Sequence, residues 1–277
     1  MDDIDLAVAL SGIAGAVLRR LSRSGLWRGA ELGRLGDRIS DEVILAGLRR
    51  HRRSDAILSE EGRSDSTRLS HHRVWIVDPL DGTIEFGEKR SDWAVQIGLA
   101  IDGRAALGVV ALPAQGVLLR SDQPPPLPSC RARPRLVVSR SHRPPNIGRL
   151  AEALNAELIP MGSVGAKVAA ILEGRAEAYI HYGGQYEWDN CAPGAIARAA
   201  GLHVSRASGA ALIYNQVNPL LPDLIICHPT LANALHRAFD RTNARVTRLE
   251  SSKVTRDRRV RRSTPPIGGE PSGAARR

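Results

Sequence analysis

The sequence predicts an α+β fold, in which helical segments and sheet segments occupy separate parts of the chain. Residues 5–24 place apolar side chains at helical spacing. Residues 93–112 form two apolar stretches around the turn Asp102-Gly103, a combination typical of a β-hairpin. After the stiff proline-rich residues 124–128, short apolar runs and helical patterns follow one another, so a second set of strands and helices is expected.

The composition indicates a chain with a real hydrophobic core. Its 277 residues suffice for one large domain or two smaller joined ones, and 43% of them are hydrophobic. No apolar run approaches the ~18–20 residues that span a bilayer. The N-terminus is acidic, so no signal peptide is predicted. The three scattered cysteines have no metal-binding spacing and indicate a reducing, cytoplasmic location.

The net charge of +10 belongs mainly to the C-terminal tail. Residues 241–277 hold 11 Lys and Arg and 3 Asp and Glu, so the tail carries 11 − 3 = +8 and the body +10 − 8 = +2. The tail lacks helical or strand periodicity and is predicted to be disordered. A nucleic-acid-binding protein that uses this tail is the alternative from another class. The nearly neutral body and the absence of aromatic residues in the tail do not favour specific binding of nucleic acid.

The first half of the chain is expected to begin with two helices and to continue into a meander of strands. Its expected elements are a helix at residues 5–24, a loop or short extended segment at 26–35, a helix from about Asp37 to Arg50, a short strand from residue 56 that ends in the acids at 60–61, a flexible loop at 62–72, strands at 74–77, 93–101, 105–112 and 116–120, and the hairpin turn at 102–103.

The strand of residues 74–77 breaks into the acidic turn Asp78-Pro79-Leu80-Asp81-Gly82-Thr83. Pro79 fixes a backbone angle, and Gly82 allows close approach of a ligand to the backbone. Two carboxylates so close repel each other unless a cation lies between them, and a site with oxygen ligands alone suits Mg²⁺. The following N–H groups are suited to a phosphate oxygen. An ordinary Asp-rich turn remains the alternative for this motif alone.

The second half is expected to alternate strands and helices. Its expected elements are strands at 136–138, 158–160, 176–181, 202–205, 212–214 and 224–227, and helices at 146–155, 163–173, 190–200 and about 229–239.

Several separated motifs, in the same order along the chain, carry a family resemblance. Asp78–Thr83, with Glu60-Glu61 upstream and Trp188-Asp189 downstream, resembles the inositol monophosphatase-like superfamily of Mg²⁺-dependent, lithium-sensitive phosphomonoesterases. The residues 81–86 and 139–142 look like the 3'(2'),5'-bisphosphate nucleotidase branch. The resemblance covers roughly residues 5–240 and implies the layered αβαβα fold shared with fructose-1,6-bisphosphatase.

The resemblance also implies the roles of the site residues. Two or three Mg²⁺ ions would be held by Glu60, Asp78, the Leu80 carbonyl, Asp81 and Asp189. Asp81, Gly82 and Thr83 would hold the phosphate. Asp37, Thr83 and Glu60 would be the catalytic residues, with the pair Asp37 and Thr83 positioning the attacking water. Without the resemblance, Asp37 and Asp189 would each be interpreted as the N-cap of a helix.

The substrate contacts implied by the resemblance are Arg140, His142, Lys167 and Asp189. Arg140 would meet the phosphate that is not cleaved, and His142 would lie by the base or ribose. Taken alone, Arg140 and His142 would be solvated loop residues and Lys167 a surface lysine. At two positions the sequence differs from the family's pattern. Tyr182 stands where inositol phosphatases carry a Glu that grips inositol hydroxyls, and His181 where several nucleotidases carry an Arg.

The predicted function is Mg²⁺-dependent hydrolysis of the 3'-phosphate of 3'-phosphoadenosine 5'-phosphate (PAP), a by-product of sulfate assimilation, to AMP and phosphate. The alternatives are an inositol 1-phosphate or fructose 1,6-bisphosphate phosphatase, or a broad sugar phosphatase. Inhibition by Li⁺ and a possible homodimer are further implications of the resemblance. The expected division of the chain is an N-terminal half at 1–123, a junction at 124–134, a C-terminal half at 135–240 and the tail at 241–277.

Overall fold

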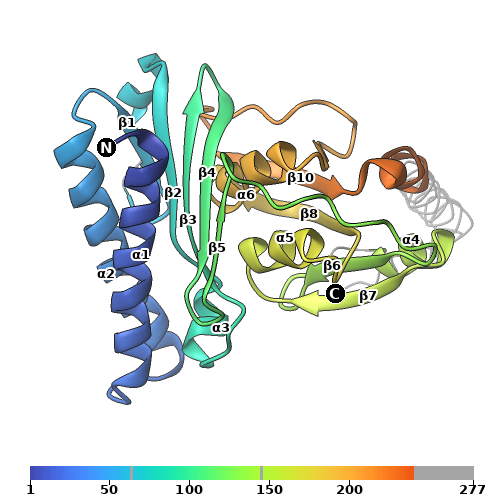
Figure 1. Cartoon of the computed structure of the whole chain (residues 1–277), viewed down its shortest axis with the longest axis horizontal. Coiled ribbons are helices and arrows are strands. Elements are labelled where there is room, and N and C mark those ends of the chain that lie inside the picture. Colours follow the sequence, from blue (N-terminus) through green and yellow to red (C-terminus); the bar gives the residue numbers. More distant parts are fainter. Residues whose placement is uncertain (63–64, 144–145, 240–277) are drawn as a thin grey trace, which may run out of the picture.

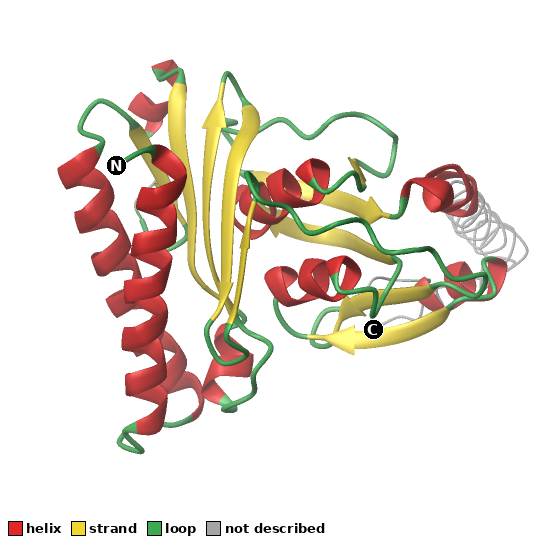
Figure 2. Cartoon of the chain, viewed as in Figure 1, coloured by secondary structure: helices red, strands yellow, loops and turns green. Residues whose placement is uncertain are grey.

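The computed structural model describes residues 1–62, 65–143 and 146–239 and arranges them in five layers (Figures 1 and 2). Helices α1 (Asp3–Arg23) and α2 (Gly29–His51) cover the outer face of a first sheet. Helices α5 (Val164–Leu172) and α6 (Glu187–Ala199) lie between this sheet and a second one. Helix α4 (Ile147–Ala153) and the helix of residues 232–239 lie beyond the second sheet. The predicted layered αβαβα fold is confirmed.

The first sheet has the strand order β1-β2-β3-β4-β5. Strand β1 pairs parallel with β2, and the next three pairings are antiparallel, which confirms the predicted meander. At the β3–β4 turn both Asp102 (φ 49°) and Gly103 (φ 71°) are left-handed, as a two-residue hairpin of type I′ requires. The strands are β1 (Ala56–Ser59), β2 (Arg73–Asp81), β3 (Ala94–Ile101), β4 (Arg104–Leu112) and β5 (Val117–Arg120).

The second sheet has the order β7-β6-β8-β10-β9. Its strands are β6 (Arg135–Ser139), β7 (Glu157–Met161), β8 (Ala178–Tyr186), β9 (His203–Ser205) and β10 (Leu220–Cys227). Strand β6 runs parallel to β8. Because parallel strands end at the same edge of a sheet, the segment that follows Ser139 and the beginning of α6 lie at one edge, which faces the acidic turn of β2.

Strand β2 is buried on both faces, which explains its continuous apolar run. Trp75 and Val77 pack against α1 and α2, whereas Val74 and Ile76 pack into the core between the sheets. That central core also takes residues of α5, α6 and both sheets. The proposed boundaries between the two halves of the chain remain a prediction.

The prediction of a loop at residues 26–35 is wrong, because α2 begins at Gly29. Two glycines in the first part of this helix are contact points. A Cβ atom on Gly33 would lie 2.6 Å from the methyl group of Thr83, and one on Gly36 would lie 2.8 Å from the ring of Phe86. Glycine therefore lets α2 lie directly on the turn that carries Thr83. Asp37 consequently lies within α2 and is not its N-cap.

Four further predictions need correction. Residues 66–70 form a short 3₁₀ helix, η1 (Ser66–Ser70), around the buried Arg68, where a flexible loop was expected. Residues 212–214 form no strand. Strand β8 continues to Tyr186, five residues beyond its expected end. The closing helix is preceded by the 3₁₀ turn η2 (Pro229–Leu231).

The short helix α3 (Thr83–Gly87) follows the acidic turn and was not predicted. The predicted disorder of the basic tail at 241–277 falls outside the described residues. Within the described part of the chain, no helix has the length and apolar content needed to cross a membrane.

Candidate active site

The acidic turn at the end of β2 is held rigidly from two sides. The Leu80 N–H donates to Asp78 Oδ1 (3.1 Å), and the Ser40 hydroxyl from α2 donates to the Pro79 carbonyl (2.7 Å). Gly82 follows with φ 90°, a left-handed conformation that favours glycine, and α3 begins at Thr83. The turn therefore presents its carboxylates and its last N–H groups in fixed directions. The contribution of Ser40 was not predicted, since its partner is 39 residues away.

Three carboxylates converge at this turn. Ligand oxygens of Asp78, Asp81 and Asp189 lie within 4.8 Å of one another, and within the described ranges this is the one such group of three or more His, Cys, Asp or Glu residues. Asp189 lies in the first turn of α6, where it accepts from the Tyr186 N–H (2.6 Å). Tyr186 is the N-cap of α6, so the interpretation of Asp189 as the N-cap itself is wrong.

Asp81 is oriented by donors on one of its two oxygens. Its Oδ2 accepts from the Gly165 N–H (2.9 Å), at the beginning of α5, and from Gln96 Nε2 (2.5 Å). These bonds leave Oδ1 for a ligand. Gln96 was missed by sequence reasoning, although one signal was present: it is a polar residue, fully buried, in an otherwise apolar strand.

The charges of this cluster are only partly balanced by protein groups. Burial raises the pKa of Asp81 to about 7 against the opposing effect of Lys167, and it likewise raises the pKa of Asp189 to about 7. Burial, and after it the charge of Glu60, raises the pKa of Asp78 well above its usual range. Only a nearby cation would let all of these carboxylates ionise at neutral pH. The oxygen-only donor set fits a hard divalent cation such as Mg²⁺.

Glu60 borders this cluster without belonging to the group of three. The parallel pairing of β1 with β2 places Ser59 opposite Val77, and the Glu60 N–H donates to the Val77 carbonyl (3.2 Å). Glu60 is exposed as a whole residue, but its carboxylate is partly shielded from water. This desolvation, together with repulsion from Asp37 and Asp81, raises the pKa of Glu60 to about 7. Glu60 is thus placed at the open side of the site.

The predicted pair Asp37 and Thr83 is in direct contact. The Thr83 hydroxyl lies 3.1 Å from Asp37 Oδ1 and 3.3 Å from the Leu80 carbonyl, and it can donate its single proton to either acceptor. Burial raises the pKa of Asp37 to about 7. The side chain of Asp37 from α2 therefore reaches the same turn as the carbonyl of Leu80.

Lys167 is a buried lysine, so its interpretation as a surface residue is wrong. Its ammonium group donates to the Gly162 carbonyl and lies 5.0 Å from the centre of the Tyr179 ring. Burial lowers the pKa of Lys167, although the charges of Asp81 and other acids oppose this effect. Lys167 thus supplies positive charge behind the carboxylate cluster.

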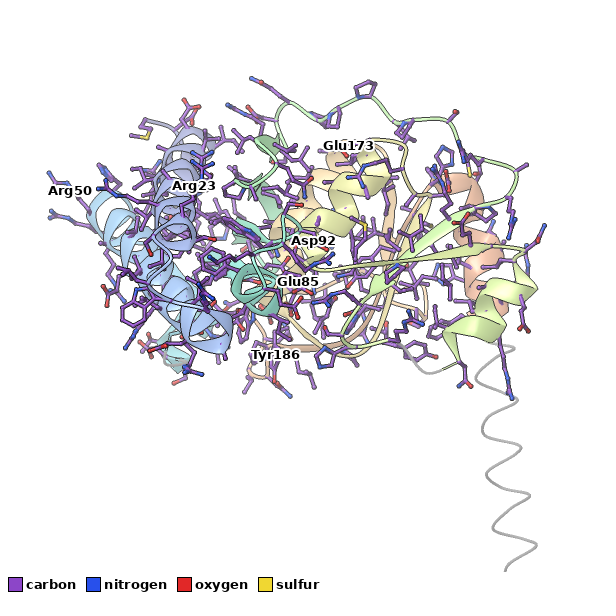
Figure 3. The ribbon with its side chains drawn as sticks, turned by 90° about the horizontal axis from the view of Figure 1, so that it is seen from below. Arg23, Arg50, Glu85, Asp92, Glu173 and Tyr186 are labelled. Carbon is purple, nitrogen blue, oxygen red and sulfur yellow. The ribbon has the colours of Figure 1, made fainter. Side chains whose placement is uncertain are left out.

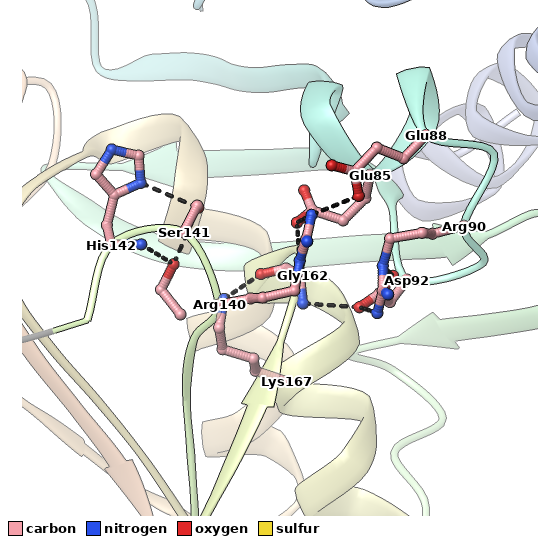
Figure 4. A network of polar contacts seen from close by, with 10 residues as sticks. Glu85, Glu88, Arg90, Asp92, Arg140, Ser141, His142, Gly162 and Lys167 are labelled. Atoms are coloured by element: carbon pink, nitrogen blue, oxygen red, sulfur yellow. Dashed lines mark hydrogen bonds and ion pairs between the residues drawn. The ribbon is translucent and has the colours of Figure 1, made fainter. Parts of the chain in front are cut away.

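Arg140 binds two carboxylates of the chain itself (Figure 4). Its guanidinium lies 3.0 Å from Glu85 Oε1 and 2.7 Å from Glu88 Oε2. In this arrangement Arg140 connects the segment after β6 to α3. Its contact with a substrate phosphate stays a prediction. Figure 3 places Glu85 and Asp92 between the N-terminal helices and the second sheet, away from Arg23 and Arg50. His142 is exposed, with its Nδ1 3.1 Å from the Ser141 hydroxyl.

Strand β8 directs His181 and Tyr182 to opposite faces of the second sheet. His181 shares a face with Tyr179, whose ring centre is 6.3 Å away, and both of its buried ring nitrogens lack a partner within the described residues. Tyr182 stacks on Phe239 at 4.6 Å, in the outer layer. The interpretation of Tyr182 as a replacement for an inositol-binding residue is therefore not supported by its position.

Known proteins resemble this chain in sequence and in fold. The sequence pattern that describes the Inositol monophosphatase family matches residues 30–243. The chain belongs to this family. One relative, "3'-phosphoadenosine 5'-phosphate phosphatase" of Mycobacterium leprae, is 40% identical over 250 residues, which cover 85% of this chain and 92% of the relative. The "3'(2'),5'-bisphosphate nucleotidase CysQ" of Escherichia coli K12 is 32% identical over 184 residues, which cover 62% of this chain and 75% of that one.

Solved structures of the family have the same fold. CysQ from Bacteroides thetaiotaomicron superposes with a TM-score of 0.73 at 29% identity, covering 81% of this chain and 96% of that one. Inositol monophosphatase II from Staphylococcus aureus superposes with a TM-score of 0.75, covering 88% of this chain and 96% of that one. At 20% identity the second likeness concerns the fold alone.

Proposed function

We propose that this chain is a Mg²⁺-dependent phosphomonoesterase that removes the 3'-phosphate of PAP and yields AMP and phosphate. The observation that carries the proposal is the convergence of Asp78, Asp81 and Asp189 beside the contact of Thr83 with Asp37. The names of the relatives support the choice of substrate, since those at 40–42% identity are PAP phosphatases. Inhibition by Li⁺, a cytoplasmic location and a homodimer belong to the same proposal.

Two or three Mg²⁺ ions would be held by Asp78, Asp81 and Asp189, with the Leu80 carbonyl and Glu60 at the border of the site. When bound, such ions supply charge for the phosphoryl oxygens and lower the pKa of a coordinated water. The protein contributes the arrangement. Asp81 is oriented by Gly165 and Gln96, and Asp189 by the first turn of α6.

The attacking water would be positioned by Thr83. When the Thr83 hydroxyl donates its proton to Asp37, the lone pairs of its oxygen can accept a hydrogen bond from a water molecule. The water then keeps its own lone pair for the phosphorus atom. Asp37 has a pKa of about 7, close to the value that favours a general base at neutral pH. The N–H groups of Gly82 and Thr83 would hold the phosphate.

The nucleotide would extend from the carboxylates toward the edge of the second sheet where β6 and β8 end. His142, in the segment after β6, and His181, on β8, lie on this side. The ion pairs of Arg140 with Glu85 and Glu88 leave the partner of the second phosphate open. For this reason inositol 1-phosphate and fructose 1,6-bisphosphate remain as alternative substrates.

The test is release of phosphate with Mg²⁺ from PAP, inositol 1-phosphate and fructose 1,6-bisphosphate, measured side by side. We expect PAP to be preferred and Asp81→Asn to lower kcat by about 10²-fold or more, since it removes transition-state charge stabilisation. The control is Asp122→Asn, which changes an exposed carboxylate paired with Arg120. Preference for a sugar phosphate would support the proposed metal site but contradict PAP as the substrate. No release from any substrate would reject the phosphatase proposal.

A further inference from the structure

A cluster of two histidines and a serine lies outside the carboxylate cluster, at the edge strand of the second sheet. His203 and Ser205 belong to β9, and His236 belongs to the helix of residues 232–239. The Nε2 atoms of the two histidines lie 3.2 Å apart. The hydroxyl oxygen of Ser205 lies 2.9 Å from Nε2 of His203 and 3.4 Å from Nε2 of His236. Three possible ligand atoms therefore face one another.

These separations match those of metal ligands. Two nitrogens at 2.0–2.1 Å from a tetrahedral zinc ion lie about 3.3 Å apart. The three observed distances fall on both sides of this value. An ion could therefore contact all three atoms with only small movements of the side chains.

The hydrogen bonds around the set leave lone pairs on two of its three atoms. Nδ1 of His236 lies 2.8 Å from the carbonyl of Ala207, which can only accept, so Nδ1 carries the proton and Nε2 does not. Donation of the second ring N–H to a backbone carbonyl is the usual arrangement of a metal-binding histidine. The Ser205 hydroxyl donates to the carbonyl of Arg206 (2.8 Å), which leaves its lone pairs free.

His203 can become the third ligand without a net release of protons. Burial, with the nearby His236, lowers the pKa of His203, so its ring is neutral at pH 7. In the hydrogen-bonded arrangement its Nε2 donates to Ser205 or His236. When an ion binds, this proton moves to Nδ1 of the same ring, and Nε2 becomes a ligand. The two rings meet nearly at right angles (85°).

We propose that His203, His236 and Ser205 form a binding site for a borderline transition-metal ion, such as Zn²⁺, Ni²⁺ or Cu²⁺, separate from the phosphatase centre. Imidazole nitrogens select these ions over Mg²⁺, which prefers oxygen ligands. The bound ion would join the helix of residues 232–239 to β9 and so stabilise the C-terminal end of the described fold.

The test adds one equivalent of Cu²⁺ to the full-length protein with excess Mg²⁺ and records the electron paramagnetic resonance spectrum. We expect superhyperfine coupling from two imidazole nitrogens, which an oxygen-only site cannot give. His236→Gln and His203→Gln should each remove one nitrogen and weaken Cu²⁺ binding by at least about tenfold. His51→Gln, which changes an exposed histidine of α2, should leave the spectrum unchanged.

A second measurement keeps the proposal testable if one variant folds poorly. Ni²⁺ should raise the melting temperature of the wild type, and of Asp78→Asn, but not that of His203→Gln. Mg²⁺-dependent release of phosphate should be the same in His203→Gln as in the wild type. Copper coupled to no nitrogen, or a nitrogen signal that survives both substitutions, would overturn the proposal. The copper spectra and the effect of Ni²⁺ on melting do not depend on phosphatase activity, so this proposal and the proposed function can fail separately.

Discussion

At the scale of single residues, the most informative contact is the hydrogen bond from Thr83 to Asp37. Thr83 belongs to the acidic turn, whereas Asp37 belongs to α2 and lies 46 residues earlier. The pair is also close to the Leu80 carbonyl, a proposed ligand. A hydroxyl in this position can orient a water molecule but adds little to substrate affinity. Its removal should therefore change the rate of the chemical step more than binding.

Thr83→Val tests this separation, because valine keeps the shape of the side chain and removes the hydroxyl. We expect kcat for PAP to fall by about 10²-fold with little change in KM, as for loss of a proton-transfer or water-positioning group. Thr83→Ser should retain most of the activity. Thr67→Val is the control, since this hydroxyl bonds the exposed Asp65. Valine at position 83 with at least half of the wild-type kcat would contradict the role.

At the scale of elements, two networks of polar contacts join segments that are far apart in the sequence. The first joins the segment after β6 to α3 through Arg140. The second joins η1 to α6: Arg68 binds Asn215 Oδ1 (2.6 Å) and the Gln216 carbonyl (2.7 Å), and the N–H groups of both residues donate to Glu187. Glu187 lies two residues before Asp189. The second network therefore helps to fix the third carboxylate of the site.

Glu85→Gln should weaken the connection between the segment after β6 and α3. Glu85 is buried, so loss of its charge leaves Arg140 with the exposed Glu88 alone. We expect KM for PAP to rise several-fold with a smaller change in kcat, and stability to fall by about 1–3 kcal/mol. Glu88→Gln is the matched control and should have little effect, as for an exposed ion pair. Equal kinetics for the two variants would show that the buried contact does not position the substrate.

Arg68→Met should loosen the connection between η1 and α6. The substitution keeps an apolar stem of similar length but removes two short hydrogen bonds from a charged group, each worth about 1.5–3 kcal/mol. We expect a lower melting temperature and a higher Mg²⁺ concentration for half-maximal activity. Arg131→Met, at an exposed position, provides the comparison. A Mg²⁺ requirement equal to that of the wild type would separate Arg68 from the metal site.

The same elements show what the sequence could and could not predict. The apolar run of β2 and the turn Asp102-Gly103 were predictable, because local patterning determines them. The gathering of Asp78, Asp81 and Asp189 followed from the family resemblance and not from spacing. The burial of Arg68 was not predictable, since its partners lie 147 and 148 residues away.

At two other positions, packing decides what local patterning and resemblance leave open. The glycines at the beginning of α2 favour a loop by propensity, yet they are needed where the helix contacts Thr83 and Phe86. The family resemblance puts Tyr182 where inositol phosphatases carry a substrate-binding Glu, whereas the alternation of β8 directs its ring to Phe239. The resemblance identified β8 as a strand beside the carboxylate cluster. The alternation of side chains along β8 decides which of them face the cluster.

At the scale of the whole molecule, the carboxylate cluster makes stability depend on pH and on metal. In the metal-free chain the pKa values of Asp37, Asp81 and Asp189 are about 7, well above the ordinary value of 3.8. The folded state therefore keeps protons that the unfolded chain releases as the pH rises above about 4. Stability is greatest below the ordinary pKa values and is lost as the pH rises through 7.

The last prediction follows from this loss of stability with rising pH. The melting temperature of the metal-free protein should fall between pH 5.5 and pH 8, by roughly 2–4 °C for each kcal/mol lost. Millimolar Mg²⁺ should restore it, and more strongly at pH 8, because the ion binds the ionised carboxylates of the folded state alone. Calorimetry at both pH values, with and without Mg²⁺, measures the effect, and Asp81→Asn should reduce it. A Mg²⁺ effect that is equal at the two pH values would mean that the carboxylates are already ionised in the metal-free fold, and that other groups of the chain balance their charge.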